Sequence, residues 1–157
     1  MIKKGFTLIE LLIGIAIMAT AFSMVSAQFR DFSRNQAVVS VARELKSDLR
    51  LAQEQSLAGK KPSGIGCDSP KVLDHYLFST NSTTYRIDAV CSSPVTMVRI
   101  KEVTLPDGIL ISAGAVSFKV LGQGTDLEAG TESVFTVTQE ATGNSTTVSI
   151  SAAGEIY

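Results

Sequence analysis

Few side chains in this sequence are of the types that carry out catalysis or bind metal ions. The only histidine, His75, follows Asp74, and the only cysteines are Cys67 and Cys91. A structural zinc site usually takes four cysteine or histidine ligands, so this set is too small to build one. A catalytic site needs several converging groups, and His75 has no second histidine beside it. We therefore expect no catalytic residue, no metal site, no cofactor and no enzymatic activity.

Two other patterns resemble ligand sites only in part. The acidic residues Asp126, Glu128 and Glu132 lack the residue order of a calcium loop. The segment Gly122-Gln123-Gly124 lacks the lysine and the following helix of a phosphate loop. We interpret the acids as solvated loop residues and the glycine segment as a hairpin turn.

Glu10 is the one charge within a long apolar segment. The 19 residues from Leu11 to Phe29 carry no charge, and a helix of roughly 20 apolar residues spans a bilayer. Lys3 and Lys4 precede this segment and favour a cytoplasmic N-terminus. A carboxylate in a hydrocarbon-facing helix costs about 2.5–3.5 kcal/mol and usually has a specific partner. Because the lysines lie nearly two helical turns away, we expect the partner of Glu10 to belong to another molecule.

The segment Lys4-Gly5-Phe6-Thr7-Leu8-Ile9-Glu10 resembles the class III signal of type IV prepilins and type II secretion pseudopilins. The resemblance implies that residues 1–5 are a leader, which a prepilin peptidase removes between Gly5 and Phe6 before N-methylation of Phe6. It also implies that Glu10 helps subunits enter a filament by pairing with the α-amine of a neighbour. Such a pair is tolerable at low dielectric, whereas either charge alone is costly. Residues 6–29 are then the transmembrane and filament-assembly helix.

Two other interpretations of the N-terminus stay open. The first is a secretory signal peptide, with Lys3-Lys4 as the basic region, Leu11 to Phe22 as the apolar region and Val25-Ser26-Ala27 as a cleavage site. The second is an ordinary single-span anchor, which has the same length requirement. Both leave Glu10 unexplained.

The helical pattern continues beyond Phe29, because no proline occurs before Pro62 and Gly59 is the first stop signal. Residues 30–59 therefore read as an amphipathic continuation of the helix, which we expect to pack mainly on the chain's own sheet. Its apolar stripe follows steps of three and four and contains Val38, Val41, Ala42, Leu45, Leu49, Ala52 and Ser56. The opposite face carries Arg43, Lys46, Ser47, Arg50, Gln53 and Glu54.

We expect residues 60–157 to form a β-rich globular head. The predicted fold class of the whole chain is α+β and pilin-like, with a long N-terminal helix packed on antiparallel sheets. Seven short runs rich in β-branched and aromatic residues alternate with turn clusters, which is typical of two antiparallel sheets packed together. The expected strands are Lys71–Phe78, Thr83–Cys91, Val95–Leu105, Gly108–Ser112, Ala115–Val120, Ser133–Gln139 and Thr146–Ser151. Alternation in the second run predicts that Tyr85, Ile87 and Ala89 share one face and that Arg86 and Asp88 share the other.

Cys67 and Cys91 are the candidates for a disulfide. An exported head lies in an oxidising compartment, where an even number of cysteines usually pairs. Closing a loop of about 25 residues stabilises a domain by roughly 3–4 kcal/mol in the chain-entropy model. The alternative is two unpaired thiols.

The charge distribution argues against nucleic acid as a partner. The net charge is −1, and no lysine or arginine follows Lys119. DNA binding requires a basic patch, and the head offers only Lys60, Lys61 and Lys71 near its start. We do not expect this chain to bind DNA.

The layout of the head is similar to the GspH/FimT group of minor pilins and pseudopilins. The residues that carry this likeness are the helix end Arg50-Leu51-Ala52-Gln53-Glu54, the segment 103–109, Phe118 and the closing Gly154-Glu155-Ile156. It implies a priming or tip subunit of a type IV pilus or type II secretion pseudopilus. The implied partners are a prepilin peptidase, other pilin or pseudopilin subunits and the inner membrane, which the precursor crosses once with its head exported.

Two alternatives to a minor subunit remain. The first is a major pilin, because a rod subunit and a priming subunit share the same N-terminal chemistry. The second is an exported ligand-binding β-domain on a membrane anchor or behind a signal peptide.

Overall fold

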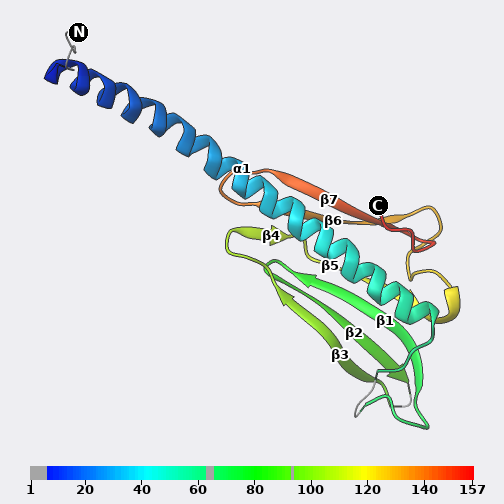
Figure 1. Ribbon diagram of the computed structural model, residues 1–157. Coiled ribbons are helices and arrows are strands. Elements are labelled where there is room, and N and C mark those ends of the chain that lie inside the picture. The colour runs from blue at the N-terminus through cyan, green and yellow to red at the C-terminus, as the bar shows by residue number, and fades with distance from the viewer. Residues whose placement is uncertain (1–6, 63–65, 93) are drawn as a thin grey trace, which may run out of the picture.

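The computed structural model describes residues 7–62, 66–92 and 94–157, apart from the side chains of residues 24–28. Along the chain, one long helix (α1) precedes strands β1 to β5, a short 3-10 turn (η1), and strands β6 and β7. The first part of α1 projects away from the rest of the molecule, and the second part lies across the sheets (Figure 1). The chain therefore has the α+β architecture that the sequence predicts.

Helix α1 (Leu8–Leu57) is continuous from the N-terminal apolar segment into the head. At 1.5 Å per residue it is about 75 Å long. It ends in a Schellman motif, in which the backbone N–H of Lys60 donates to the carbonyl of Gln55 over 3.0 Å. This motif needs a left-handed residue, and Gly59 supplies it with φ of 58°. The helix thus stops at the signal that the sequence predicts.

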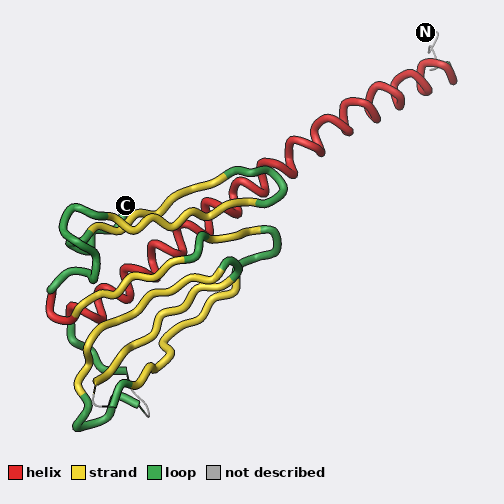
Figure 2. Tube along the Cα trace, turned by 180° about the vertical axis from the view of Figure 1, so that it is seen from behind, coloured by secondary structure: helices red, strands yellow, loops and turns green. Residues whose placement is uncertain are grey.

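The strands form two antiparallel sheets, seen from behind in Figure 2. The larger sheet has the order β3-β2-β1-β5 and the smaller one the order β4-β6-β7. All seven predicted strands are present, and their ends differ from the prediction by a few residues. The bounds are β1 (Val72–Asn81), β2 (Thr84–Ser92), β3 (Thr96–Thr104), β4 (Ile109–Ile111), β5 (Gly114–Lys119), β6 (Glu132–Gln139) and β7 (Ser145–Ser151), with η1 (Val120–Gly122) after β5.

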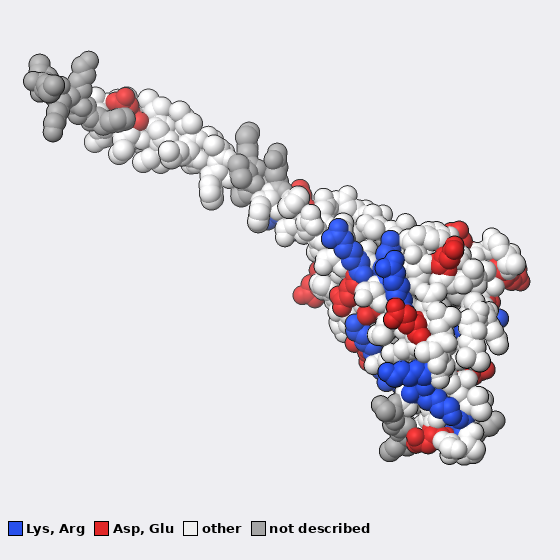
Figure 3. Space-filling view, turned by 45° about the vertical axis from the view of Figure 1, so that its right-hand side comes forward, with Lys and Arg blue, Asp and Glu red and all other residues white. Residues whose placement is uncertain are grey.

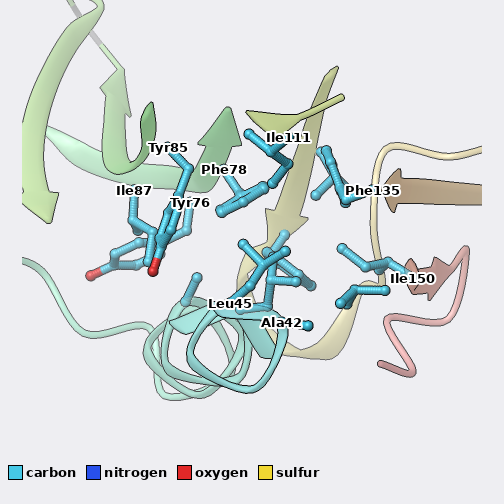
Figure 4. Close-up of a cluster of buried hydrophobic side chains, with 14 of the residues drawn as sticks. Ala42, Leu45, Tyr76, Phe78, Tyr85, Ile87, Ile111, Phe135 and Ile150 are labelled. Atoms are coloured by element: carbon cyan, nitrogen blue, oxygen red, sulfur yellow. The ribbon is translucent and has the colours of Figure 1, made fainter. Parts of the chain in front are cut away.

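The apolar stripe of α1 forms one wall of the hydrophobic core. Every residue of the predicted stripe is buried, and Leu45, Leu49 and Ala52 are fully inaccessible to solvent. The sheets face this stripe with large side chains, including Phe78 of β1 and Phe135 of β6 (Figure 4). The rings of these two residues meet edge to face, with centroids 5.1 Å apart, and so join the two sheets.

The packing of the two sheets differs from the sequence-based expectation of two sheets packed together. Both sheets turn their apolar faces toward α1, and the buried side chains in Figure 4 lie between the helix and the surrounding strands. The helix already supplies the second layer that each sheet needs to bury its apolar face. The core is therefore shared by the helix and both sheets.

Alternation in β2 is as predicted on the inner face, where Tyr85, Ile87 and Ala89 are all buried. On the predicted outer face Asp88 is nevertheless buried. The guanidinium Nε of Arg86 lies 3.8 Å from its carboxylate and that of Arg99 lies 3.4 Å away. These two arginines cover the acid on the outside of the sheet.

Candidate functional site

The start of α1 is fixed by a cap that places Glu10 in the first turn. Thr7 has an extended backbone, and its hydroxyl accepts a hydrogen bond from the backbone N–H of Glu10 over 3.4 Å. A threonine cap followed three residues later by a glutamate is the sequence pattern of a capping box, a signal that the sequence analysis missed. Glu10 is exposed, and it has no ion-pair partner within the described part of the chain.

The helix beyond Glu10 exposes a long apolar surface. Between Leu8 and Met18 the large apolar side chains are 55–77% exposed, and Phe22, Phe29 and Phe32 are 59–77% exposed. They are exposed because this part of α1 projects past the sheets (Figure 1). A contiguous apolar surface of this size is typical of a protein or membrane interaction site.

Polar side chains in this half of α1 are satisfied within the helix. The hydroxyl of Thr20 donates to the carbonyl of Ile17 over 2.9 Å, and that of Ser23 donates to the carbonyl of Ala19 over 2.8 Å. Gly14 leaves open space where a side chain would stand. This half of the helix therefore exposes apolar side chains and the small residue Gly14, with Glu10 as its charged group before Arg30.

Comparison with protein families decides how this N-terminal surface is interpreted. Residues 1–26 match the model of the prokaryotic N-terminal methylation motif, which is the signature of type IV pilins and pseudopilins. The N-terminus of the chain carries the type IV pilin-like motif. This motif implies processing by a prepilin peptidase and assembly with other pilins. The cleavage residues Gly5 and Phe6 lie outside the described residues.

The other two comparisons found no similar protein. Neither the curated proteins nor the solved structures gave a match. In the described part of the chain, no helix meets the length and hydropathy that a membrane span requires.

The other side chains considered for chemistry are dispersed over the head. His75 lies in β1, partly exposed, and its Nδ1 is 2.9 Å from a carboxylate oxygen of Asp74. Asp126 accepts a hydrogen bond from the backbone of Ser117, while Glu128 and Glu132 are exposed. Among the described residues, no three histidine, cysteine or acidic side chains are grouped in a way that would hold a metal ion. The segment Gly122-Gln123-Gly124 turns the chain back along β5, where Thr125 bridges Phe118.

The lysines at the start of the head are partly engaged in hydrogen bonds. The ammonium group of Lys61 donates to the carbonyl of Lys71 over 2.5 Å, and that of Lys71 donates to the hydroxyl of Thr96 over 2.7 Å. These contacts tie the segment after α1 to β1 and β3. They leave Lys60 as the member of the group whose ammonium forms no hydrogen bond within the described residues.

The structure joins Cys67 to Cys91 in a disulfide, as the sequence predicts. Their Cα atoms are 5.6 Å apart, and both side chains are buried. The bond connects the segment before β1 to the end of β2. The disulfide closes a loop from residue 67 to residue 91, which contains β1 and most of β2.

A buried acid on the inner face of α1 escaped the sequence analysis. Asp48 accepts a hydrogen bond of 2.7 Å from the hydroxyl of Tyr85, which lies on β2. Burial and then this hydrogen bond raise the pKa of Tyr85 far above its usual range. Gln53 was also placed on the wrong face, because its amide donates to the carbonyl of Gly154 over 2.9 Å. Both side chains therefore fix α1 to the head.

Proposed function

We propose that this chain is a filament subunit of the type IV pilus or type II secretion pseudopilus kind, with a mechanical role and no catalytic turnover. In this proposal prepilin peptidase cuts the precursor between Gly5 and Phe6 and methylates the new N-terminus of Phe6. The observation that carries the proposal is the methylation motif at the head of a helix whose exposed half is apolar.

Before assembly, residues 6–29 anchor the precursor in the inner membrane and the head lies outside the cytoplasm. The uncharged segment from Leu11 to Phe29 supports this step, because its length suits a bilayer. The disulfide between Cys67 and Cys91 supports the exported location of the head, because such bonds persist in oxidising compartments.

Assembly replaces lipid around the exposed half of α1 with the same half of neighbouring subunits. Glu10 then pairs with the α-amine that cleavage creates on a neighbour's Phe6. A carboxylate and an amine tolerate low dielectric as a pair, and each is costly alone. Cleavage and assembly are thereby linked, because an uncut chain lacks the amine at that position.

Within this class we propose a minor subunit of the GspH/FimT kind that primes or tips the filament. The support is the sequence layout, in which the helix, the segment 103–109 and the closing Gly154-Glu155-Ile156 follow that group's order. Mass-spectrometric counting of this chain in sheared filaments tests the assignment. A few copies per filament agree with it, and a dominant share would make the chain a major pilin.

Replacement of Glu10 tests the filament role. Glu10→Ala should leave membrane insertion intact and abolish recovery of the chain in the filament fraction. Glu54→Ala is the matched control, because Glu54 is an exposed acid on the same helix. Normal recovery of the Glu10→Ala chain would refute the role of this carboxylate in assembly.

A further inference from the structure

Three basic side chains form a ridge on the exposed side of α1. Arg43, Lys46 and Arg50 follow one another at steps of three and four, so they share one side of the helix over about 10 Å. Arg43 and Arg50 are exposed and Lys46 is half-buried. None of the three forms an ion pair with another described residue. We call these three residues the basic ridge.

The basic ridge is unfavourable in the isolated chain. Like charges three or four residues apart on a helix repel each other. Glu54 lies one turn beyond Arg50 and also forms no ion pair among the described residues. In Figure 3 lysine and arginine side chains run down the head, with acidic side chains beside and between them. A partner with carboxylates would relieve this repulsion.

The same chain carries an acidic surface of suitable shape. A groove of about 540 Å³ lies where β6 begins and β7 ends, and its charged residues are Glu132 and Glu155. The rest of its lining is small, including Ala129, Gly130 and Ala153. No lysine or arginine occurs anywhere after Lys119, so no basic residue lines the groove. We call it the acidic groove.

The glutamates of the acidic groove change the pKa of the neighbouring Tyr157. The hydroxyl of Tyr157 donates a hydrogen bond to a carboxylate oxygen of Glu132. This hydrogen bond, followed by burial and by the charges of Glu132 and Glu155, raises the pKa of Tyr157. The phenol therefore stays protonated and orients the Glu132 carboxylate beside the groove.

We propose that the basic ridge of one copy of this chain docks into the acidic groove of a second copy. The ridge is convex and the groove is concave, and their charges are opposite. In the proposed contact the side chains of Arg43, Lys46 and Arg50 lie beside Glu132 and Glu155. No ion pair joins the ridge to the groove within the described residues of one molecule, so both surfaces are available to a second copy.

The contact is heterologous, because the two surfaces are different. Within the proposed minor role it joins the few copies of this chain that lie next to one another in the filament. An isologous dimer would instead place ridge against ridge. The inference deepens the proposed function, on which it rests, because it names the surfaces through which the heads of neighbouring copies meet.

Zero-length carbodiimide cross-linking of the full-length chain in detergent micelles tests the docking. Lys46 is the one amine of the ridge, so the expected product is an isopeptide between Lys46 and Glu132 or Glu155. Chains with natural and heavy nitrogen are mixed, and cross-linked peptides of mixed isotope composition identify contacts between copies. The yield should fall roughly tenfold when salt rises from about 0.05 M to about 0.5 M.

Charge reversal provides the second measurement. Glu132→Lys with Glu155→Lys should lower the mixed cross-link roughly tenfold, and so should Arg43→Glu with Arg50→Glu. The combination of all four substitutions should restore cross-linking between the substituted positions. Asp107→Lys is the matched control, because it makes the same charge change at an exposed acid outside the groove. Unchanged melting temperatures exclude misfolding as the cause.

Two outcomes would overturn the inference. In the first, Lys46 forms no mixed cross-link while Lys60 and Lys61 form them freely. In the second, the natural chain shifts the mobility of a short DNA duplex, and charge reversal of the ridge abolishes that shift but leaves cross-linking between copies unchanged. Nucleic acid would then be the partner of the ridge. The assay uses the uncut chain, so its result does not depend on N-terminal processing. A failure of N-terminal processing would overturn the proposed function and would be seen separately.

Discussion

Lys101 of β3 holds Asp48 of α1 in an ion pair across the interface between the helix and the larger sheet. The ammonium nitrogen of Lys101 lies 2.7 Å and 2.8 Å from the two carboxylate oxygens of Asp48. The side chain of Asp48 is 7% exposed and that of Lys101 is 37% exposed. With the hydroxyl of Tyr85 as a further donor, Asp48 is a buried acid whose carboxylate is fully engaged.

Removal of Lys101 should therefore destabilise the docking of α1. Lys101→Met keeps the length of the side chain and leaves the carboxylate of Asp48 buried with one donor fewer. We expect the free energy of unfolding to fall by about 2 kcal/mol, below the cost of breaking a fully buried pair because Lys101 is partly exposed. Urea denaturation followed by circular dichroism measures the change. Lys119→Met is the control, and an equal effect of both substitutions would contradict the role of the pair.

Alkaline pH should destabilise the head through its buried tyrosines. Burial raises the pKa of Tyr76, and burial with the Asp48 hydrogen bond raises the pKa of Tyr85. The unfolded chain therefore releases these protons first, at about pH 10, so the stabilisation is complete below that pH and is lost as pH rises above it. Urea midpoints at about pH 8 and about pH 11 measure this loss. Tyr85→Phe should reduce it, and an unchanged pH dependence in that variant would show that Tyr85 does not cause it.

Reduction of the disulfide should lower the stability of the head. The bond joins two buried residues that are 24 positions apart in the sequence. On the chain-entropy model its loss costs roughly 3 kcal/mol. Thermal melting with and without reductant measures this effect, and Cys67→Ser with Cys91→Ser should melt at the reduced value under both conditions. Identical melting of the natural chain in both buffers would contradict a stabilising bond.

The buried stripe of α1 should be far more sensitive to truncation than its exposed side. Leu45 is fully buried among both sheets, whereas Leu51 on the same helix is 36% exposed. Leu45→Ala should cost about 3 kcal/mol of unfolding free energy, and Leu51→Ala about 1 kcal/mol or less. Chemical denaturation of the two variants compares them directly. Equal losses would mean that the helix does not dock through the stripe.

Periodicity in the sequence predicted much of this fold. The stripe from Val38 to Ser56 is buried as its spacing indicates, because an amphipathic helix has one face that can be removed from water. The strands were located by alternation and by their turns, which are local properties of the chain. The N-terminal motif, also local, identified the segment that the methylation-motif comparison matches.

Periodicity does not show which residues far apart in the sequence contact each other. Asp48 was missed because an acid on a helix is normally exposed, and its partner Lys101 lies 53 residues further along the chain. Asp88 is buried because of Arg99 on a neighbouring strand, and strand order cannot be read from periodicity. The sequence predicted a helix packed on antiparallel sheets, but it did not show that both sheets turn their apolar faces toward that helix.

The N-terminus of the mature chain tests the central claim most directly. The full-length protein is expressed with a prepilin peptidase, recovered from the membrane and analysed by intact mass and N-terminal sequencing. The account predicts a chain that begins with N-methylated Phe6 and retains the apolar half of α1. A chain that still begins with Met1, or one that begins near Gln28 after loss of the apolar segment, would contradict it.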